Sequence, residues 1–267
     1  MVRKTSFLLN LAFSSRLHES LCPTAGGSKV SYDGFKTLCE KAGISKIGFI
    51  RHGKTSPKPE GGHDFDRLLT DEGRNQAKEA GSSFGREMKP LYHSILVSPA
   101  PRTVETAEIF LECIRNTDKT TSPCSLVPAQ RLYDGTMQPE GGPLFQQLGY
   151  APLRDYLDNP ESKDRELARV LLGQYADTVI EAMSHIMESC STKQSDPERT
   201  ATDTTFWMVG HAIYLPAAAL GVASILDCNP SGIETILSSN TKEAEGYLID
   251  ISSDAAEAKY LARPSNC

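Results

Sequence analysis

Two arginines and two histidines stand directly after short apolar runs of this chain. Arg51 and His52 follow the apolar run at residues 47–50, while Arg102 and His211 stand a few residues after two later runs. A guanidinium group is a permanently charged, planar donor that matches the oxygens of a phosphate. A neutral imidazole can attack phosphorus and hold the phosphoryl group covalently. These four side chains could therefore bind a phosphate ester and transfer its phosphoryl group.

The apolar runs at residues 47–50, 95–97 and 206–209 have the length and composition of buried strands. In open α/β sheets, ligands bind outside the carboxyl ends of parallel strands. We therefore expect the polar residues after the three runs to meet at one edge of a sheet. Gly53 follows His52, at a place where the backbone must turn sharply or approach a ligand. A single histidine after an apolar run is more often a core or solvated residue, so the recurrence of the pattern favours a site.

Four motifs follow one another in a specific order and spacing. They are Arg-His-Gly-Lys-Thr at residues 51–55, Leu-Thr-Asp-Glu-Gly-Arg-Asn-Gln-Ala at 69–77, Ser-Pro-x-x-Arg-x-x-x-Thr-Ala at 98–107 and Gly-His at 210–211. This set resembles the histidine phosphatase superfamily, which has the phosphoglycerate-mutase-like fold. The resemblance covers residues 46–251. It implies an α/β fold, a three-layer sandwich with a mostly parallel central sheet and a helical cap insertion at about residues 136–190.

The resemblance also implies roles for individual residues. His52 would be the nucleophile, and Arg51, Arg102, His211 and Thr55 would bind the substrate phosphate. An arginine at the start of a helix is poorly placed for the helix dipole unless an anion binds between them. His211 would be protonated beside bound phosphate and would donate to the developing charge.

The general acid is the least secure assignment. In the superfamily it is a carboxylate in a Leu-x-Glu segment, and Asp134 in Leu132-Tyr133-Asp134 matches it with Asp for Glu. Asp-Gly is also a common turn sequence, and Glu140 is close enough in the sequence to be the alternative.

The motifs predict a metal-independent phosphatase that hydrolyses a phosphate monoester, or a phosphohistidine, through a phosphohistidine intermediate. No Asp, Glu, His or Cys cluster has metal-ligand spacing, and two guanidiniums with an imidazolium supply positive charge, so we expect no metal and no cofactor. The substrate would be a small phosphorylated metabolite or a phosphoprotein. A phosphoglycerate-type mutase and an inactive relative that binds phosphorylated ligands are the alternatives. A proline-lysine-proline stretch at 57–59 stands where mutases have an asparagine, and an inactive relative would be expected to lose one of the four core residues.

Residues 64–73 resemble the phosphohistidine-phosphatase branch, which commonly has Asp-x-x-Arg-Pro-Leu-Thr, with Leu68 in place of the proline. Arg67 in this segment could contact substrate, although an ion pair with Asp66 is the simpler expectation. His63, Asp64 and Asp66 are expected to be loop and cap residues rather than metal ligands.

The composition excludes several partners. The 267 residues carry a net charge of −6 with a pI near 5.6, whereas nucleic-acid and anionic-membrane partners require basic surfaces. No apolar run approaches the ~18 residues of a membrane span. Seven cysteines, an odd number without Cys-x-x-Cys spacing, favour a reduced, intracellular and cytoplasmic protein. Residues 1–18 contain three lysine or arginine residues and neither Asp nor Glu, the composition of an organelle-targeting peptide or of a solvated terminus.

The flanking segments complete the expected organisation. Residues 1–45 would form an N-terminal extension, partly disordered or targeting, with a helix at 32–42 that packs on the domain. Residues 233–237 and 247–251 read as the last two strands. Residues 252–267 would be a loose C-terminal tail.

Overall fold

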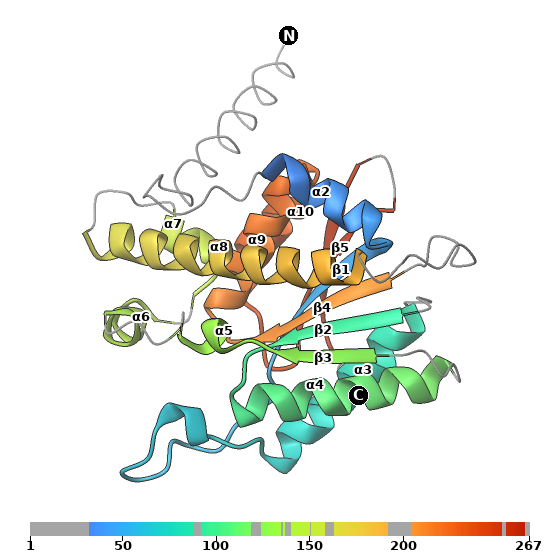
Figure 1. Ribbon diagram of the computed structural model, residues 1–267. Coiled ribbons are helices and arrows are strands. Elements are labelled where there is room, and N and C mark those ends of the chain that lie inside the picture. Colours follow the sequence, from blue (N-terminus) through green and yellow to red (C-terminus); the bar gives the residue numbers. More distant parts are fainter. Residues whose placement is uncertain are drawn as a thin grey trace.

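The central layer is a six-stranded sheet with the strand order β3-β2-β4-β1-β5-β6 (Figure 1). Strands β1, β2, β3 and β4 run parallel, β5 is antiparallel to β1, and β6 is antiparallel to β5. The computed structural model describes residues 32–87, 92–118, 124–134, 136, 140–149, 151–157, 163–191, 204–252 and 255–264. The strands are β1 (Ile44–Arg51), β2 (Tyr92–Val97), β3 (Cys124–Pro128), β4 (Thr204–Gly210), β5 (Gly246–Asp250) and β6 (Glu257–Leu261).

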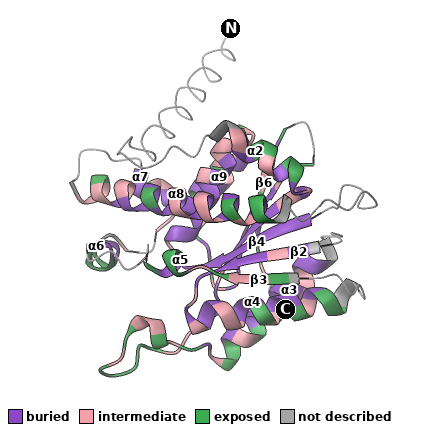
Figure 2. Cartoon of the chain, in the orientation of Figure 1, coloured by how far each residue is buried: buried purple, intermediate pink, exposed green. Residues whose placement is uncertain are grey.

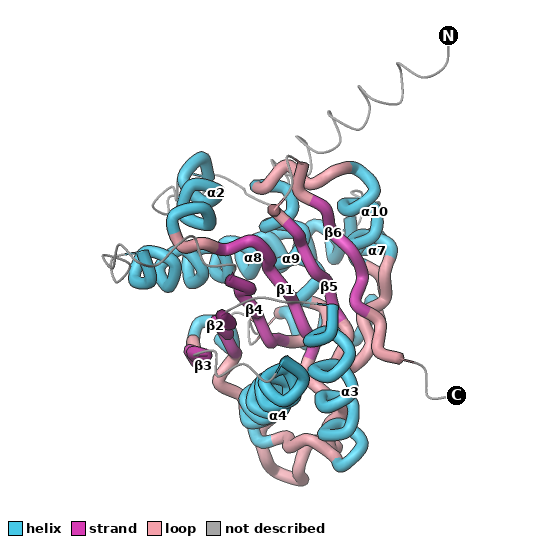
Figure 3. Tube along the Cα trace, turned by 90° about the vertical axis from the view of Figure 1, so that its right-hand side faces the viewer, coloured by secondary structure: helices cyan, strands magenta, loops and turns pink. Residues whose placement is uncertain are grey.

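Helices cover both faces of the sheet, as the view turned by 90° shows (Figure 3). The helices α3 and α4 pack on one face, and α2, α8, α9 and α10 pack on the other. The helical elements are α2 (Tyr32–Lys41), η1 (Asp64–Asp66), α3 (Asp71–Glu87), α4 (Pro101–Asp118), α5 (Gln130–Asp134), α6 (Gly141–Leu148), α7 (Leu153–Leu157), α8 (Lys163–Ser191), α9 (Tyr214–Ile225) and α10 (Pro230–Ser238). The α/β, three-layer, mostly parallel prediction is confirmed.

The strands build two hydrophobic cores because successive side chains point to opposite faces of a sheet. Phe49 packs with the α2, α8 and α9 side, whereas Ile50 packs with the α3 and α4 side. All seven residues of β4 are buried, which explains the continuous apolar run of a central parallel strand. Figure 2 shows the buried strands between half-buried helices.

The predicted N-terminal boundary lies too far along the chain. Within the expected extension 1–45, α2 buries Phe35 and Cys39 completely in the core. The expected packing of this helix on the domain is confirmed, and α2 is part of the domain for the same reason. Residues 1–31, with the targeting prediction for 1–18, lie outside the described residues.

Two predictions for the C-terminal part are wrong. Residues 233–237 belong to helix α10, because the side chain of Asn229 accepts a hydrogen bond from the Gly232 N–H at 2.7 Å and Pro230 occupies the first turn. These are N-terminal helix signals. Within the expected tail 252–267, residues 257–261 form β6, whose polar outer positions Glu257 and Lys259 hide its strand character.

The expected cap insertion at 136–190 is smaller than predicted. Its longest helix, α8, buries Leu172, Tyr175 and Met183 against α9 and the sheet, so it belongs to a layer of the sandwich. The described residues on the site side of this segment are Thr136 and part of α6. Within the described ranges, no helix combines the length and apolarity needed to cross a membrane.

Candidate active site

The segments that follow β1, β4 and β2 meet at the carboxyl edge of the sheet. Arg51, the last residue of β1, pairs with Gly210, the last residue of β4. The N–H of His52 donates to the Gly210 carbonyl oxygen at 3.0 Å, and the N–H of Ser98 donates to the Val209 carbonyl oxygen at 3.2 Å. The strand register therefore fixes the backbone on which the site residues stand.

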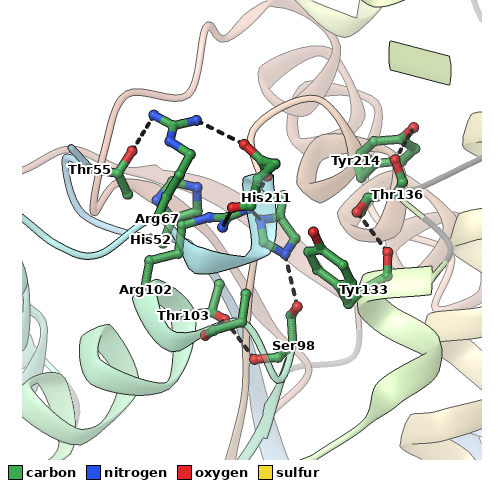
Figure 4. Close-up of polar contacts among 12 residues, drawn as sticks. His52, Thr55, Arg67, Ser98, Arg102, Thr103, Tyr133, Thr136, His211 and Tyr214 are labelled. Carbon is green, nitrogen blue, oxygen red and sulfur yellow. Dashed lines mark hydrogen bonds and ion pairs between the residues drawn. The ribbon is translucent and has the colours of Figure 1, made fainter. Parts of the chain in front are cut away.

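A cavity of about 900 Å³ opens above this edge. It brings together five of the six predicted residues, Arg51, His52, Thr55, Arg102 and His211. Figure 4 shows His52, Arg102 and His211 next to one another, with Arg67 reaching Thr55. The remaining lining residues are Lys54, Lys58, Asp64, Arg67, Thr136, Gly142, Phe145, Gln146, Ala212, Ile213, Tyr214, Asn240, Thr241, Lys242 and Glu243.

His52 is held in one protonation state and one tautomer. Its Nδ1 lies 2.8 Å from the carbonyl oxygen of Gly53, and since a carbonyl only accepts, Nδ1 carries the hydrogen and Nε2 keeps its lone pair. Burial is the largest effect and lowers the pKa of His52 to about 3; the Gly53 hydrogen bond opposes this lowering, and smaller effects of the charges of Arg102 and Arg51 add to it. The ring is therefore a neutral imidazole with an available nucleophilic nitrogen.

His211 is also buried, and its ring centroid lies 5.4 Å from that of His52. Its Nε2 is 2.8 Å from Ser98 Oγ, and its Nδ1 is 3.4 Å from Arg102 Nη2. Because a guanidinium only donates, Nδ1 is the accepting nitrogen and Nε2–H donates to Ser98. Burial, followed by the charges of His52, Arg102 and Arg51, lowers the pKa of His211 well below its ordinary value. His211 is therefore neutral in this arrangement, and its expected protonation beside bound phosphate stays a prediction.

The guanidinium of Arg102 is almost completely buried, with its side chain 4% exposed. Nη1 donates to the backbone oxygen of Asp64 at 2.6 Å, and Nη2 donates to Asp64 Oδ2 at 2.7 Å. Burial lowers the pKa of Arg102, and the Asp64 carboxylate opposes this lowering. The partner of this arginine in the ligand-free protein is therefore a carboxylate of the same chain.

Arg51 meets a second carboxylate. Its Nη1 donates to the Thr241 carbonyl oxygen at 2.8 Å, and its Nη2 donates to Glu243 Oε1 at 3.3 Å. Thr241 and Glu243 lie just before β5, the antiparallel neighbour of β1. The late part of the chain thus orients the first motif arginine.

Asp134 does not join the other predicted residues. Its exposed side chain accepts a hydrogen bond from Gln130 Nε2 at 2.8 Å, within the short helix α5, and it is absent from the cavity lining. The alternative acid, Glu140, is exposed before α6 and is also absent from the lining. The carboxylates that line the cavity are Asp64 and Glu243.

Arg67 lines the cavity, and its expected ion pair with Asp66 is wrong. Arg67 Nη1 donates to Asp64 Oδ1 at 3.2 Å, Nε donates to the Ser56 carbonyl oxygen at 2.9 Å, and Nη2 bonds Thr55 Oγ1. The Asp66 carboxylate instead accepts from the His63 N–H at 3.1 Å. The Asp-x-x-Arg spacing at residues 64–67 was the available signal, because i and i+3 side chains share a face of a helical turn.

Sequence reasoning also missed three lysines of the cationic lining. Lys54, Lys58 and Lys242 line the cavity beside the three arginines already named. Against these cations stand the carboxylates of Asp64 and Glu243. The cavity is therefore positively charged, although the whole chain has a net charge of −6. A positive potential in a cavity attracts anionic ligands.

Two glycines allow the first two motifs to touch. A Cβ atom on Gly53 would lie 2.4 Å from the carbonyl oxygen of Gly73, and a Cβ on Gly73 would lie 2.1 Å from the carbonyl oxygen of Lys54. Gly73 stands in the first turn of α3, whose N-terminus is capped by Thr70 Oγ1, accepting from Gly73 N–H at 3.0 Å. This close approach sets the path of the backbone around His52.

Thr106 couples the third motif to the first. The N–H of Gly53 donates to Thr106 Oγ1 at 3.1 Å, and this hydroxyl donates to the Arg102 carbonyl oxygen at 2.6 Å. Because Thr106 lies on α4 one turn after Arg102, the helix that carries the arginine is tied to the histidine turn.

In the part of the chain that the structure describes, no group of three or more His, Cys, Asp or Glu side chains is arranged to hold a metal ion.

Comparison with known families gives the class of protein. Residues 47–122 match the histidine phosphatase superfamily (branch 1). This segment contains Arg51, His52 and Arg102. The superfamily includes phosphatases and mutases. Comparison with curated proteins found no match.

Among solved structures, the chain is similar to SixA of Agrobacterium tumefaciens, with 16% identity, 82% of this chain and 98% of that chain covered, and a TM-score of 0.46. The phosphoserine phosphatase of Entamoeba histolytica in complex with 3-phosphoglyceric acid is 14% identical, with 81% of this chain and 96% of that chain covered and a TM-score of 0.45. The protein histidine phosphatase SixA complexed with tungstate is 14% identical, with 81% of this chain and 94% of that chain covered and a TM-score of 0.38. At these identities, the activities of those proteins do not transfer to this chain by similarity.

Proposed function

We propose that this protein is a metal-independent phosphatase that hydrolyses a phosphate monoester, or a phosphohistidine, through a phosphohistidine intermediate on His52. The observation that carries the proposal is the fixed neutral tautomer of His52 inside a cavity with two buried or half-buried motif arginines. A neutral imidazole whose Nδ1 is bonded to a carbonyl presents Nε2 as the attacking atom. Arg51 and Arg102 provide the permanent positive charge that phosphoryl transfer requires.

The reaction proceeds in two displacements. In the first, His52 Nε2 forms a bond to phosphorus while the bond from phosphorus to the leaving oxygen breaks, and that oxygen takes a proton from the cavity-lining carboxyl group of Asp64. In the second, the Asp64 carboxylate takes a proton from a water molecule as its oxygen bonds to phosphorus, the P–N bond breaks, and inorganic phosphate leaves with His52 neutral again. His211 donates from its ring to the phosphoryl group, since an adjacent dianion opposes the lowering of its pKa.

Arg51, Arg102 and His211 bind the phosphoryl oxygens in this proposal, and Thr55 supports them. Thr55 lines the cavity and bonds Arg67, so its hydroxyl orients a further cation toward the ligand. The size of the cavity, about 900 Å³, exceeds that of a single phosphate group. The substrate therefore carries an organic part or a peptide next to its phosphate.

The proposal is tested by trapping the intermediate. Brief exposure to a substrate with a radiolabelled phosphoryl group, followed by alkaline quenching, should leave label on the protein, whereas acid quenching should remove it. His52→Ala should abolish the labelling. The matched control is His185→Ala, which removes an exposed histidine from α8 and should label like the wild type.

The product decides between hydrolysis and transfer. A phosphatase releases inorganic phosphate from its substrate, whereas a mutase returns the phosphoryl group to a second hydroxyl. We expect inorganic phosphate from a panel of phosphorylated metabolites and phosphohistidine proteins. Labelling that persists in His52→Ala, or a positional isomer as the main product, would contradict the proposal.

A further inference from the structure

Two of the cavity-lining arginines, Arg102 and Arg67, bind Asp64. One oxygen of its carboxylate accepts from Arg102 Nη2 at 2.7 Å, and the other accepts from Arg67 Nη1 at 3.2 Å. Its backbone oxygen accepts from Arg102 Nη1 at 2.6 Å. A single carboxylate, that of Asp64, thus accepts hydrogen bonds from two cavity-lining arginines.

These donors are the ones that an incoming phosphate requires. Arg102 Nη2 also lies 3.4 Å from His211 Nδ1, so the nitrogen that bonds Asp64 is in the middle of the site. Guanidinium donors bind carboxylate and phosphate oxygens in the same forked geometry. A phosphate group cannot take the full set of Arg102 donors while the Asp64 carboxylate remains on them.

The segment that carries Asp64 is closed at its base and exposed over residues 57–61. The base is formed by an isolated bridge between Thr55 and Leu69, with the Ser56 N–H donating to the Leu68 carbonyl oxygen at 2.9 Å. Residues 57–61 between the base and η1 are exposed. A loop with these features can move its centre without loss of its attachment.

Besides the Asp64–Arg102 pair, the ring of Phe65 contacts Tyr133, with centroids 4.8 Å apart and an interplanar angle of 86°. The Tyr133 ring in turn lies 6.0 Å from that of His211. The side chain of Asp64 is 41% exposed, so the ion pair is partly screened by water and can be exchanged for a stronger anion. The backbone contact and the Phe65 ring can stay while the carboxylate leaves.

We infer that Asp64 is an internal anion that binds the phosphate-binding arginines and is displaced when the phosphate group of a substrate binds. This inference rests on the proposed function. Displacement lowers the apparent affinity for phosphate by the fraction of molecules in which the carboxylate is in place. It also means that Arg102 is never left buried without a counter-charge, which would be costly.

The test is the affinity for inorganic phosphate, measured by calorimetric titration at neutral pH. Asp64→Asn removes the competing charge and keeps the shape, and we expect it to bind inorganic phosphate about 3- to 30-fold more tightly than the wild type. The control is Asp66→Asn, which removes the same charge two residues away, where the carboxylate bonds only the His63 N–H among the described contacts. We expect a change of less than about twofold for this control.

Asp64→Ala provides a second variant, because it removes the hydrogen-bond acceptor as well as the charge. Circular dichroism and thermal unfolding establish that each variant is folded. Tighter binding by both Asp64 variants, with the control unchanged, supports the inference.

Unchanged or weaker binding in the Asp64 variants would overturn the inference and make Asp64 a residue that only positions Arg102. An equal gain in Asp66→Asn would also overturn it, since the effect would then be a general one of loop charge. If phosphate binds neither the wild type nor the variants, both this inference and the proposed function fail. Phosphate binding that is equal in all proteins removes the inference alone.

Discussion

The Nδ1 atom of His52 lies 2.8 Å from the carbonyl oxygen of its own neighbour, Gly53. This contact between neighbouring residues fixes the hydrogen on Nδ1, so Nε2 keeps the lone pair with which it can attack phosphorus. It is possible because Gly53 follows a path that packs against Gly73 with no room for a side chain. The nucleophile is therefore prepared by backbone geometry, before any substrate is present.

The first prediction concerns the protonation of His52. Because burial lowers its pKa to about 3, the ring should remain neutral from pH 8 down to about pH 4, whereas an ordinary histidine would gain a proton near pH 6.5. Ring nitrogen chemical shifts, assigned by comparison with His52→Ala, measure this directly. A titration of the His52 ring near pH 6.5 in the ligand-free protein would contradict the prediction.

The lowered pKa of His52 also makes the free energy of unfolding depend on pH. Between about pH 6.5 and pH 3 the unfolded chain binds a proton at this histidine and the folded chain does not. The free energy of unfolding should therefore decrease as the pH falls through this window. Urea unfolding at neutral and at mildly acidic pH should show a smaller decrease for His52→Gln than for the wild type.

The second prediction identifies the proton donor to the leaving oxygen. Asp134 lies outside the cavity, so Asp134→Asn should change kcat by less than about twofold on both alkyl and aryl phosphates. Asp64 lines the cavity and contacts the same guanidinium nitrogen as His211. Once a bound phosphate has displaced it from Arg102, the Asp64 carboxyl group faces a dianion instead of a cation and can hold the proton for the leaving oxygen, so Asp64→Asn should reduce kcat on an alkyl phosphate by ~10²–10⁴-fold. The aryl phosphate, which has a stable leaving oxygen, should be affected much less.

Glu243→Gln is the comparison variant, because it removes the other cavity-lining carboxylate. A selective loss on the alkyl phosphate in Asp134→Asn would return the role to Asp134. Equal losses on both substrates in Asp64→Asn would show that Asp64 acts on Arg102 rather than on the leaving group.

The third prediction tests the contact between the first two motifs. In Gly73→Ala the added Cβ would meet the Lys54 carbonyl oxygen at 2.1 Å, which forces the backbone next to His52 to shift. We expect a loss of about 1–3 kcal/mol in the free energy of unfolding, together with a decrease in kcat. Chemical denaturation and steady-state kinetics measure the two effects.

Gly34→Ala is the matched control for this substitution. Gly34 lies in α2 with nothing within 4 Å of an added Cβ, so alanine should leave kcat unchanged and increase stability by about 0.5–1 kcal/mol. If Gly73→Ala behaves like Gly34→Ala, the close approach does not shape the site.

The fourth prediction concerns metals. Charge neutralisation by Arg51 and Arg102 requires no ion, so dialysis against EDTA should leave the hydrolysis of an aryl phosphate unchanged within about twofold. Activity that is lost on dialysis and restored by zinc or magnesium would contradict the mechanism.

The sequence by itself determined the central sheet and the residues at its edge. A central parallel strand is buried on both faces, so it must be a continuous apolar run, and 47–50, 95–97 and 206–209 have this property. Polar residues directly after such runs can only emerge at the carboxyl edge. The grouping of Arg51, His52, Arg102 and His211 around one cavity follows from these local patterns.

Only the tertiary structure decided which carboxylates reach the cavity. Asp64 and Arg102 are 38 residues apart, and their contact depends on how the loop before α3 folds back over the first turn of α4. Asp134 has the right local pattern but belongs to a short helix that directs it to solvent. The protonation states of His52 and His211 were decided in the same way, because burial and neighbouring charges lower both pKa values and no local sequence pattern encodes either effect.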